Sequence, residues 1–383
     1  MIEYIILAFW LSPLAFAAMM ALGILAERYR RHSLGTRRPR LLIVQVPTVG
    51  NCETTNRALL AAKRICTELG IPCETWVVIE EGDDPSRYAA DRAVVVPRGF
   101  RCEALYKARA LEYARRLRLR EQPDGNYAVL QLDDDSVPTP ELVRDCYRID
   151  ADVMVATIAP RAVSVSGILA DYERPVACMM WCLVFTNLSA PVWGHGEGMC
   201  IAGRVDRAVS YDVSDIGGRI PLISSEDMVY LHKAVHLGFR KVYATRSRVI
   251  ISTPLTLRDA YRQRRRWFWG NIRAALWILP PASRARVLAA WVFSMLCYAV
   301  ATAGAVLVPL GLAPMPGWTY PLAWASLAAW LAVRGIANWL VLGKKHGILA
   351  ALASYVTATL NFGLHLAGLL RGDPKRFEVI RKA

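Results

Sequence analysis

The stretch QLDDDSVP, residues 131–138, decides the fold. An apolar run leads into three consecutive acids, Asp133, Asp134 and Asp135, and this pattern predicts a buried strand that ends in carboxylates. Ligands of open α/β sheets bind at the carboxyl ends of strands. Adjacent carboxylates need a positive partner, usually a hard divalent cation, and such a cation can in turn hold a diphosphate. The alternative is a solvated acidic turn in which an aspartate caps a helix.

Strands and helices alternate on the N-terminal side of this stretch. Apolar, β-branched runs predict strands, and apolar residues at helical spacing predict helices between them, the first of which is stopped by Gly70. This alternation indicates an α/β fold with a doubly wound, mostly parallel sheet. Acids end two of the strands, Glu80 and Glu81 in one and the three aspartates in the other, so we expect one nucleotide site at the sheet edge. The expected strands are 41–46, 75–84, 94–97, 127–135 and 153–157, and the expected helices are 53–69 and 104–119.

The composition predicts a soluble middle between membrane segments. Hydrophobic residues make up 54% of the 383-residue chain, and the mean hydropathy is +0.26, which is too apolar for an ordinary soluble enzyme. The apolar excess lies at the two ends, where four segments reach the ~20 residues that a span needs. A cleaved signal peptide is the alternative for the first segment, but no basic region precedes it. The four segments are 4–26, 287–312, 320–342 and 348–370.

Basic residues set the expected orientation. Six arginines follow the first apolar segment between residues 28 and 40, which places the middle domain on the cytoplasmic side. The net charge of +15 fits a domain that lies on anionic membrane lipids. Nucleic-acid binding is the other explanation, but no such motif is visible, so we expect no nucleic-acid partner. The nine cysteines are scattered without CxxC spacing, which suggests neither disulfides nor a zinc site.

The number of spans conflicts with this orientation. One N-terminal span and three C-terminal spans would leave the basic tail, residues 372–383, on the outer side, against the positive-inside bias. We therefore expect two or three true spans within 287–371. The segment that does not span is expected to be either 320–342, which carries Arg334 and Asn338, or 348–370, which carries Asn361 and His365.

A second motif, SSEDMVY at residues 224–230, offers a general base. It lies between a glycine-rich stretch and an apparent helix from Asp227 to Gly238. A carboxylate facing an acceptor hydroxyl can remove its proton during attack. The alternative is an N-capping pattern, in which Ser225 and the acids complement the helix dipole.

A third motif, QRRRW, gives Gln263, Arg266 and Trp267 in a QxxRW pattern. Arginine can clamp a leaving phosphate, glutamine adds hydrogen bonds, and tryptophan offers a stacking face. The alternative is a basic, tryptophan-rich helix at the membrane surface, and we expect 261–279 to be an interfacial helix. Residues 178–188 are apolar and aromatic, and are expected to form a buried or interfacial helix.

Together, DxD, ED and QxxRW in this order between membrane segments resemble the membrane-bound family 2 glycosyltransferases. These include cellulose, chitin and hyaluronan synthases, ceramide glucosyltransferase and egghead-type β-mannosyltransferases. The resemblance covers roughly residues 41–267 and implies a GT-A fold, a UDP-sugar or GDP-sugar donor, Mg²⁺ or Mn²⁺, and inversion at the anomeric carbon. It implies a plan of N-terminal helix 1–27, basic linker 28–40, catalytic domain 41–258, interfacial helix 259–286, membrane segments 287–371 and tail 372–383.

The resemblance also assigns roles to residues. Asp227 matches the family's catalytic base, and Asp133 and Asp135 match the metal ligands. The residues that match donor contacts are Pro47, Thr48, Glu80, Glu81, Lys107, Asp133, Asp134, Gln263, Arg266 and Trp267. Those at acceptor positions are His195, Gly196, Glu197, Gly198, Glu226 and Trp267.

Two departures shape the expected function. Glutamate replaces aspartate in the family's DDG turn, and HGEGM (195–199) is closer to the lipid-acceptor members than to the polysaccharide synthases. We therefore expect β-linked transfer to a lipid-linked or glycolipid acceptor. The alternative is a processive synthase that extends and exports a polysaccharide. Two alternatives belong to other classes of protein. The intact motifs argue against a catalytically inactive scaffold, and the small number of spans argues against a transporter subunit.

Overall fold

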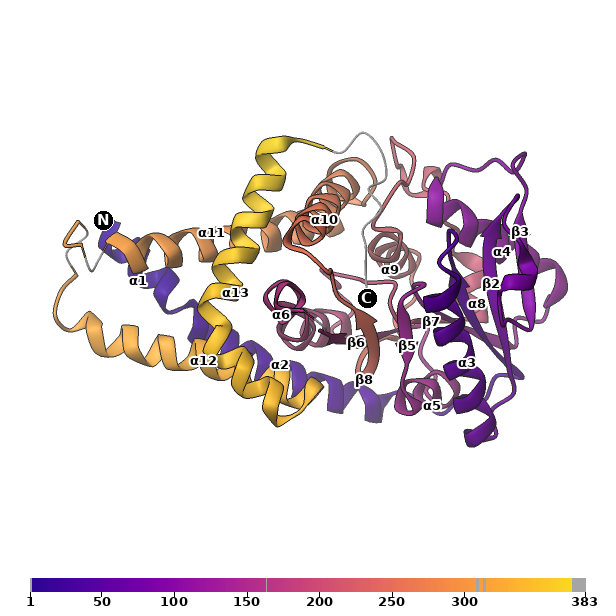
Figure 1. The fold of residues 1–383 in the computed structure, drawn as a ribbon, viewed down its shortest axis with the longest axis horizontal. Coiled ribbons are helices and arrows are strands. Elements are labelled where there is room, and N and C mark those ends of the chain that lie inside the picture. The colour runs from indigo at the N-terminus through magenta and orange to yellow at the C-terminus, as the bar shows by residue number, and fades with distance from the viewer. Residues whose placement is uncertain (1, 163, 308–309, 313–314, 374–383) are drawn as a thin grey trace.

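The computed structural model describes all residues except 1, 163, 308–309, 313–314 and 374–383. A sheet with its covering helices occupies one end of an elongated molecule, and long helices extend from it to the other end (Figure 1). The predicted basic tail, residues 372–383, lies outside the described residues from 374 onward.

Eight strands form one mixed sheet in the order β3-β2-β1-β4-β7-β6-β8-β5. The first four strands are parallel wherever they pair, as the sequence predicted. Their bounds are β1 (Leu41–Pro47), β2 (Cys73–Glu80), β3 (Arg92–Val96) and β4 (Tyr127–Gln131). The others are β5 (Ser136–Pro138), β6 (Val153–Arg161), β7 (Met199–Ala202) and β8 (Val242–Ser252).

The sheet is less parallel than expected beyond β4. Strand β7 is antiparallel to both β4 and β6, and β5 is antiparallel to β8. The strands β5, β7 and β8 were not predicted from the sequence. β5 and β7 have only three and four residues, too few to show a clear alternation, and β8 carries polar residues at its centre.

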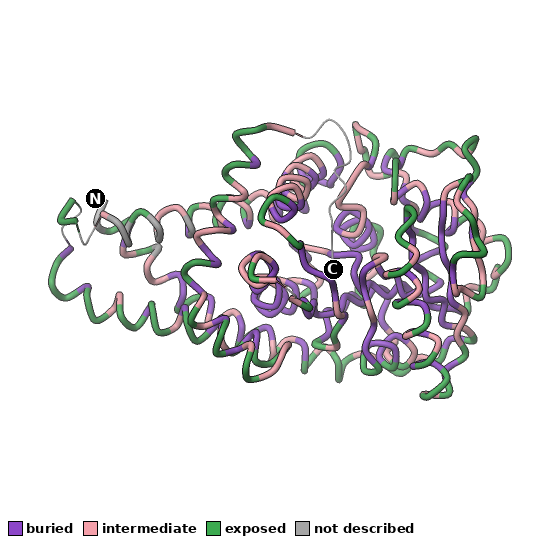
Figure 2. The backbone as a smooth tube through the Cα atoms, viewed as in Figure 1, coloured by how far each residue is buried: buried purple, intermediate pink, exposed green. Residues whose placement is uncertain are grey.

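The two faces of the sheet bury separate cores. Along β1, Leu42 and Val44 face one core with Ala58 of α3 (Cys52–Leu69), while Ile43 faces the other with Ala114 of α4 (Tyr106–Glu121). This period-2 division is what a strand covered on both sides requires. Figure 2 shows the strands of the sheet mostly buried and much of the long helices exposed.

Shorter helices connect the strands and carry the polar motifs. In chain order they are η1 (Pro85–Arg87), α5 (Pro140–Arg148), α6 (Val165–Asp171), α7 (Glu173–Ala177), the π-helical segment η2 (Cys178–Thr186), α8 (Gly203–Ala208), η3 (Ser214–Ile216), α9 (Glu226–His236) and α10 (Leu257–Trp277). The segment 178–188, expected to be a buried or interfacial helix, is thus mostly the buried π-helix η2.

Five long or terminal helices form the other end: α1 (Ile2–Trp10), α2 (Ser12–Ser33), α11 (Pro281–Leu307), α12 (Thr319–Leu342) and α13 (Lys344–Arg371). Among the described residues, three stretches are long and apolar enough to cross a membrane: Tyr4–Ser33, Thr319–Leu342 and Lys344–Arg371. The predicted span 287–312 forms most of α11, which is not one of the three. In Figure 1, α2, α11 and α12 run along the molecule, and α13 crosses them.

The basic segment after the first span is docked on the sheet domain. Helix α2 continues to Ser33, so half of the expected linker 28–40 is helical. Arg31 donates two hydrogen bonds to Asp145, at 3.1 and 2.8 Å, and the buried Glu27 accepts one from Tyr243 at 2.7 Å. These contacts fix the first long helix against α5 and β8.

Candidate active site

One cavity of about 1250 Å³ joins the carboxyl ends of β1, β2 and β4 to the long helices. Its polar end holds the three aspartates and the acids of the SSEDMVY motif. Its other end is lined by side chains of α2, η2, α11 and α12. Most of the predicted site residues, together with residues of the predicted membrane segments, therefore line one cavity.

Lys107 links the first two motifs. Its Nζ lies 2.5 Å from Asp133 Oδ1 and 2.8 Å from Glu226 Oε1. Burial opposes the ammonium charge, but the carboxylates of Asp133, Glu226 and Asp227 outweigh it, so the pKa of Lys107 lies well above its usual range. The lysine stays charged and holds two carboxylates that would otherwise repel each other.

The three consecutive aspartates have different surroundings. Asp134 accepts hydrogen bonds from Asn51 Nδ2 at 2.5 Å and Thr48 Oγ1 at 3.4 Å, which turns it toward the loop after β1. Asp135 is 5% exposed and, like Asp133, lines the cavity. Asp133 and Asp135 therefore offer carboxylate oxygens to one space, the donor type that Mg²⁺ and Mn²⁺ prefer.

The charge of the lining suits a cation. Acidic side chains outnumber lysines and arginines among the residues that line the cavity. Burial lowers the pKa of the Arg266 guanidinium, although the carboxylates of Glu226, Asp133, Glu197 and Asp135 oppose this shift. The residues present therefore fit the expected metal.

Asp227 lies in the first turn of α9. Ser225 before it has a left-handed backbone (φ +59°), and its Oγ donates to Asn271 Oδ1 at 2.7 Å. A Cβ at Gly270 would lie 2.5 Å from Ser224 Oγ and 2.8 Å from Ser225 Oγ, so any side chain there would push these serine hydroxyls out of place. Helix α10 thus fixes the backbone that presents Asp227.

The electrostatics of Asp227 suit a base. Burial and the neighbouring charge of Glu226 raise its pKa to about 7, against the opposing charge of Lys107. Its Oδ1 accepts a hydrogen bond from the Met228 amide at 2.9 Å. A carboxylate with a pKa near neutral pH can take a proton from a hydroxyl and still be ionised in the resting enzyme.

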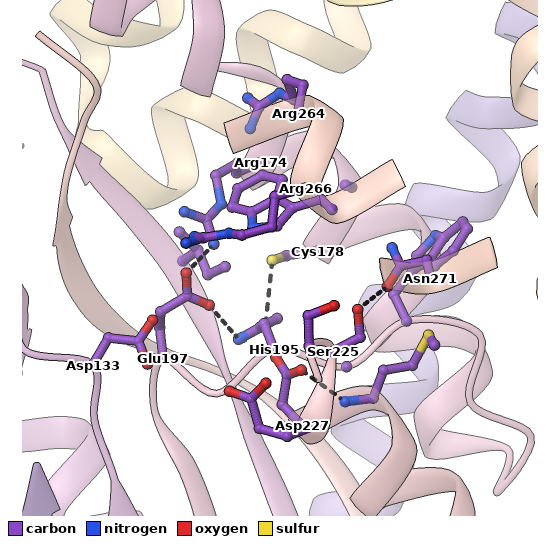
Figure 3. Close-up of a pocket in the computed structure, with 18 of the residues that line it drawn as sticks. Asp133, Arg174, Cys178, His195, Glu197, Ser225, Asp227, Arg264, Arg266 and Asn271 are labelled. Carbon is purple, nitrogen blue, oxygen red and sulfur yellow. Dashed lines mark hydrogen bonds and ion pairs between the residues drawn. The ribbon is translucent and has the colours of Figure 1, made fainter. Parts of the chain in front are cut away.

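The HGEGM loop passes directly beside this cluster. A Cβ at Gly196 would lie 3.1 Å from Lys107 Nζ and 3.5 Å from Asp227 Cβ. His195 and Glu197 line the cavity, and Glu197 Oε1 pairs with Arg174 Nη2 at 2.6 Å (Figure 3). Gly198 has φ +88° and packs against Ala156 and Val249, so its role is to bend the backbone.

The QxxRW residues divide into two groups. Arg266 and Trp267 line the cavity, whereas Gln263 is buried outside it and accepts a hydrogen bond from Arg264 at 3.1 Å. The Trp267 ring contacts two guanidinium groups, Arg264 at 4.6 Å and Arg174 at 4.9 Å from the ring centre. Such cation–π contacts fix the ring in one orientation.

Only one of the two acids at the end of β2 reaches the cavity. Glu80 lines the cavity and pairs with Arg109 at 2.7 Å. Glu81 accepts from the Arg98 amide at 2.7 Å and does not line the cavity. Of the two predicted nucleotide contacts, the structure brings only Glu80 to the site, together with Pro47 and Thr48.

Sequence reasoning missed several residues of the site. Arg264 lies within the QRRRW motif and Asn51 lies shortly after the predicted donor contacts Pro47 and Thr48, but neither was chosen. Arg174, Cys178 and Cys182 gave no signal by spacing. Each of the five lines the cavity. Contacts made across the fold, such as that of Arg174 with Glu197, leave no periodic trace in a sequence.

The far end of the cavity is aromatic. Phe16, Trp181, Trp193 and Trp291 line it together with Met295. The rings form a chain of contacts, Trp181 with Trp193 at 6.5 Å and Trp193 with Trp291 at 5.2 Å between centroids. An aromatic surface of this kind can pack against the hydrocarbon part of a ligand or against the face of a sugar ring.

Comparison with solved structures gives only weak likenesses. TarS 1-349 of S. aureus, solved with UDP-GlcNAc, is 16% identical over 88% of this chain and 94% of its own, with a TM-score of 0.34. The glucosyl-3-phosphoglycerate synthase of M. tuberculosis is 13% identical over 61% and 79%, with a TM-score of 0.37. A mycobacterial protein is 13% identical over 67% and 76%, with a TM-score of 0.38. At these TM-scores neither a fold nor a ligand transfers to this chain.

Comparison by sequence gives a clear family. No curated protein matches the chain. The model of glycosyl transferase family group 2, however, matches residues 128–359, which is more than half of the 383 residues. This range contains the aspartates, the ED motif and the QxxRW motif. The protein belongs to glycosyl transferase family group 2.

Proposed function

We propose that this protein transfers a sugar from a nucleotide-sugar donor to a lipid acceptor at a membrane surface, forming a β-glycosidic bond with inversion. The observation that carries the proposal is the single cavity, which joins a carboxylate cluster to an aromatic chamber walled by the long helices. A water-soluble donor and an apolar acceptor would meet where these two ends join.

The polar end suits the donor. The residues that would hold a divalent metal are Asp133 and Asp135, and the metal would supply positive charge to the leaving diphosphate. Lys107 and Arg266 lie at the same end of the cavity and add further positive charge. Thr48, Asn51 and Glu80 form the wall nearest β1 and β2, where the nucleoside would lie. The donor is a UDP-sugar or a GDP-sugar.

Asp227 is the proposed base. It removes the proton of the acceptor hydroxyl as the oxygen attacks the anomeric carbon from the face opposite the diphosphate. One displacement of this kind inverts an α-linked donor into a β-linked product. It needs no covalent intermediate and so no second carboxylate at the distance used in retaining hydrolysis.

The far end suits an apolar acceptor better than a growing polysaccharide. Beside the aromatic rings, the chamber is lined by Val176, Met180, Met295 and the thiol of Cys297. These side chains offer few hydrogen bonds to a chain of hydroxyls. Two polar side chains that the long helices add to the lining are already paired, Arg334 with Glu173 and Asn361 with Arg264. Large apolar residues are also exposed on the outer faces of the long helices, for example Leu22, Trp324 and Leu352 at 56%, 70% and 79%, which is expected where lipid covers them.

The arrangement of the long helices supports a cytoplasmic catalytic domain. If α2, α11 and α12 span, and α13 lies across them at the interface, the C-terminal end is on the same side as the sheet domain. Asn361 and His365 of α13 line the cavity, and Asn361 Oδ1 accepts from Arg264 of α10 at 3.0 Å. The course of α13 across the other long helices in Figure 1 favours 348–370 as the segment that does not span, which satisfies the positive-inside bias. Length and composition alone would instead count α13, and not α11, among the spans.

Transfer assays test the proposal. Membranes containing the protein are given Mn²⁺ and a panel of radiolabelled UDP-sugars and GDP-sugars, and the label is partitioned between organic solvent and high-molecular-mass material. We expect one donor to label the organic fraction, and the Asp227→Asn variant to lose this label. Asp84→Asn, which alters an exposed carboxylate outside the cavity, is the matched control. Label in large polymer would support the processive alternative instead.

A further inference from the structure

Two cysteines and a histidine meet in the wall of the cavity. Cys178, Cys182 and His195 are all buried, and their possible ligand atoms lie within 4.8 Å of one another. Cys178 Sγ and His195 Nε2 are 3.8 Å apart (Figure 3). The two cysteines are four residues apart on the π-helical segment η2, and π-helical turns are frequent at functional sites.

From this cluster we infer a binding site for a soft divalent cation of the zinc class, separate from the Mg²⁺ or Mn²⁺ site proposed at the aspartates. Two thiolates and one imidazole are a common zinc ligand set, and three protein ligands leave a fourth position open. All three residues line the cavity, so water or a hydroxyl oxygen from the cavity completes the coordination.

The distances are close to those that zinc requires. With Zn–S bonds of about 2.3 Å and Zn–N bonds of about 2.0 Å, the ligand atoms of a tetrahedral site lie roughly 3.5–4 Å apart. The separations between the ligand atoms, which are at most 4.8 Å, therefore need to shorten by no more than about 1 Å. Rotation of the side chains can supply this change. Binding forms two metal–sulfur bonds and one metal–nitrogen bond, and two thiol protons leave to solvent.

The second nitrogen of His195 supports the same inference independently. His195 is 8% exposed, and its Nδ1 is buried without a hydrogen-bond partner among the described residues. The carboxylate of Glu197 lies 3.8 Å from this nitrogen and is anchored by Arg174. A carboxylate behind a histidine ligand is the usual second partner of a zinc site, because it orients the ring that binds the metal through its other nitrogen.

The charges around the cluster are compatible with a divalent cation. Two thiolates neutralise the metal, so the nearby guanidinium of Arg174 meets no net positive charge. Thiolate is the form that binds metal, and soft sulfur ligands select zinc over the Mg²⁺ or Mn²⁺ that suit carboxylates.

Metal analysis of the purified protein tests this inference without an activity assay. The protein is purified in detergent through a tag without histidine, stripped with a chelator, loaded with zinc and desalted before the metal is counted. We expect about one zinc per chain for the unmodified protein and little for Cys182→Ser. The matched control is Cys200→Ser, which alters another buried cysteine outside the cluster and keeps its zinc.

Cobalt loading guards against a variant that fails to fold. Cobalt in the unmodified protein should give the near-ultraviolet charge-transfer band of a thiolate ligand, and Cys182→Ser should weaken it. The inference is overturned if the folded, unmodified protein retains no zinc and shows no such band, or if Cys182→Ser binds zinc as tightly as the unmodified protein. If the protein retains no zinc after loading but still transfers sugar, the zinc site is refuted and the proposed function stays intact.

Discussion

Replacement of Asp227 by asparagine should separate donor binding from transfer. Asparagine has nearly the same size but cannot accept the proton of the acceptor hydroxyl. Loss of a general base typically costs about 10²–10⁴-fold in rate, which corresponds to about 3–5 kcal/mol of transition-state stabilisation. The ion pairs of Lys107 with Asp133 and Glu226 do not involve the substituted group, so the affinity for the nucleoside diphosphate should change by no more than about threefold.

The pH dependence follows from the same residue. Because burial and Glu226 raise the pKa of Asp227 to about 7, the base is protonated and inactive below that pH. The value of kcat/KM should therefore rise about tenfold per pH unit up to about 7 and then level off. Glu226→Gln removes the negative neighbour and leaves the charge of Lys107 less opposed, so it should move this rise to lower pH.

The assay is single-turnover transfer of radiolabelled sugar, with diphosphate affinity measured on the same samples by calorimetry. Asp84→Asn serves as the control and should match the unmodified protein in both. The reasoning fails if Asp227→Asn retains more than about a tenth of the transfer rate. It also fails if the profile between pH 5.5 and 8 is flat for an enzyme whose chemical step limits the rate.

Three other substitutions test separate parts of the account. Arg118→Met should destabilise the fold by about 3–5 kcal/mol, because Arg118 and Asp206 are a fully buried ion pair and the substitution leaves the aspartate unpaired; an unchanged denaturation midpoint would refute this. Gly270→Ala should lower the transfer rate strongly and the melting temperature only slightly, since its Cβ would collide with Ser225 and displace the base. Measuring both the rate and the melting temperature separates the two effects. Asp135→Asn should raise the Mn²⁺ concentration needed for half-maximal transfer, and an identical titration curve would exclude Asp135 as a ligand.

Much of the fold could be predicted from local pattern. The strands that became β1, β2, β3 and β4 are continuous apolar runs, and helix α3 ends at Gly70, whose φ of +61° suits glycine. The strands β5 and β7 could not be predicted, because three or four residues show no clear period. Their antiparallel pairing is set by neighbours distant in the chain, which is why the predicted parallel sheet became a mixed one.

The candidate site also has residues that could be predicted from the sequence and residues that could not. Asp133, Asp227 and Arg266 stand in motifs with fixed spacing, and the structure brings all three to one cavity. Arg174 and Cys178 contact Glu197 and His195 of the HGEGM loop, and contacts between segments so different in sequence could not be predicted from spacing. Gln263 shows the opposite case, since it belongs to a motif but bonds to Arg264 outside the cavity.

The central claim is that the aromatic chamber receives the acceptor while the carboxylate end holds the donor. Ser294 of α11 lines this chamber, so Ser294→Trp should fill it, whereas Leu296→Trp on the same helix changes a side chain that is 46% exposed on the outer face. The measurement is sugar transfer to the organic-soluble acceptor beside nucleoside-diphosphate affinity for both variants. We predict that Ser294→Trp loses transfer and keeps diphosphate affinity, while Leu296→Trp keeps both. Undiminished transfer by a folded Ser294→Trp protein would contradict the account.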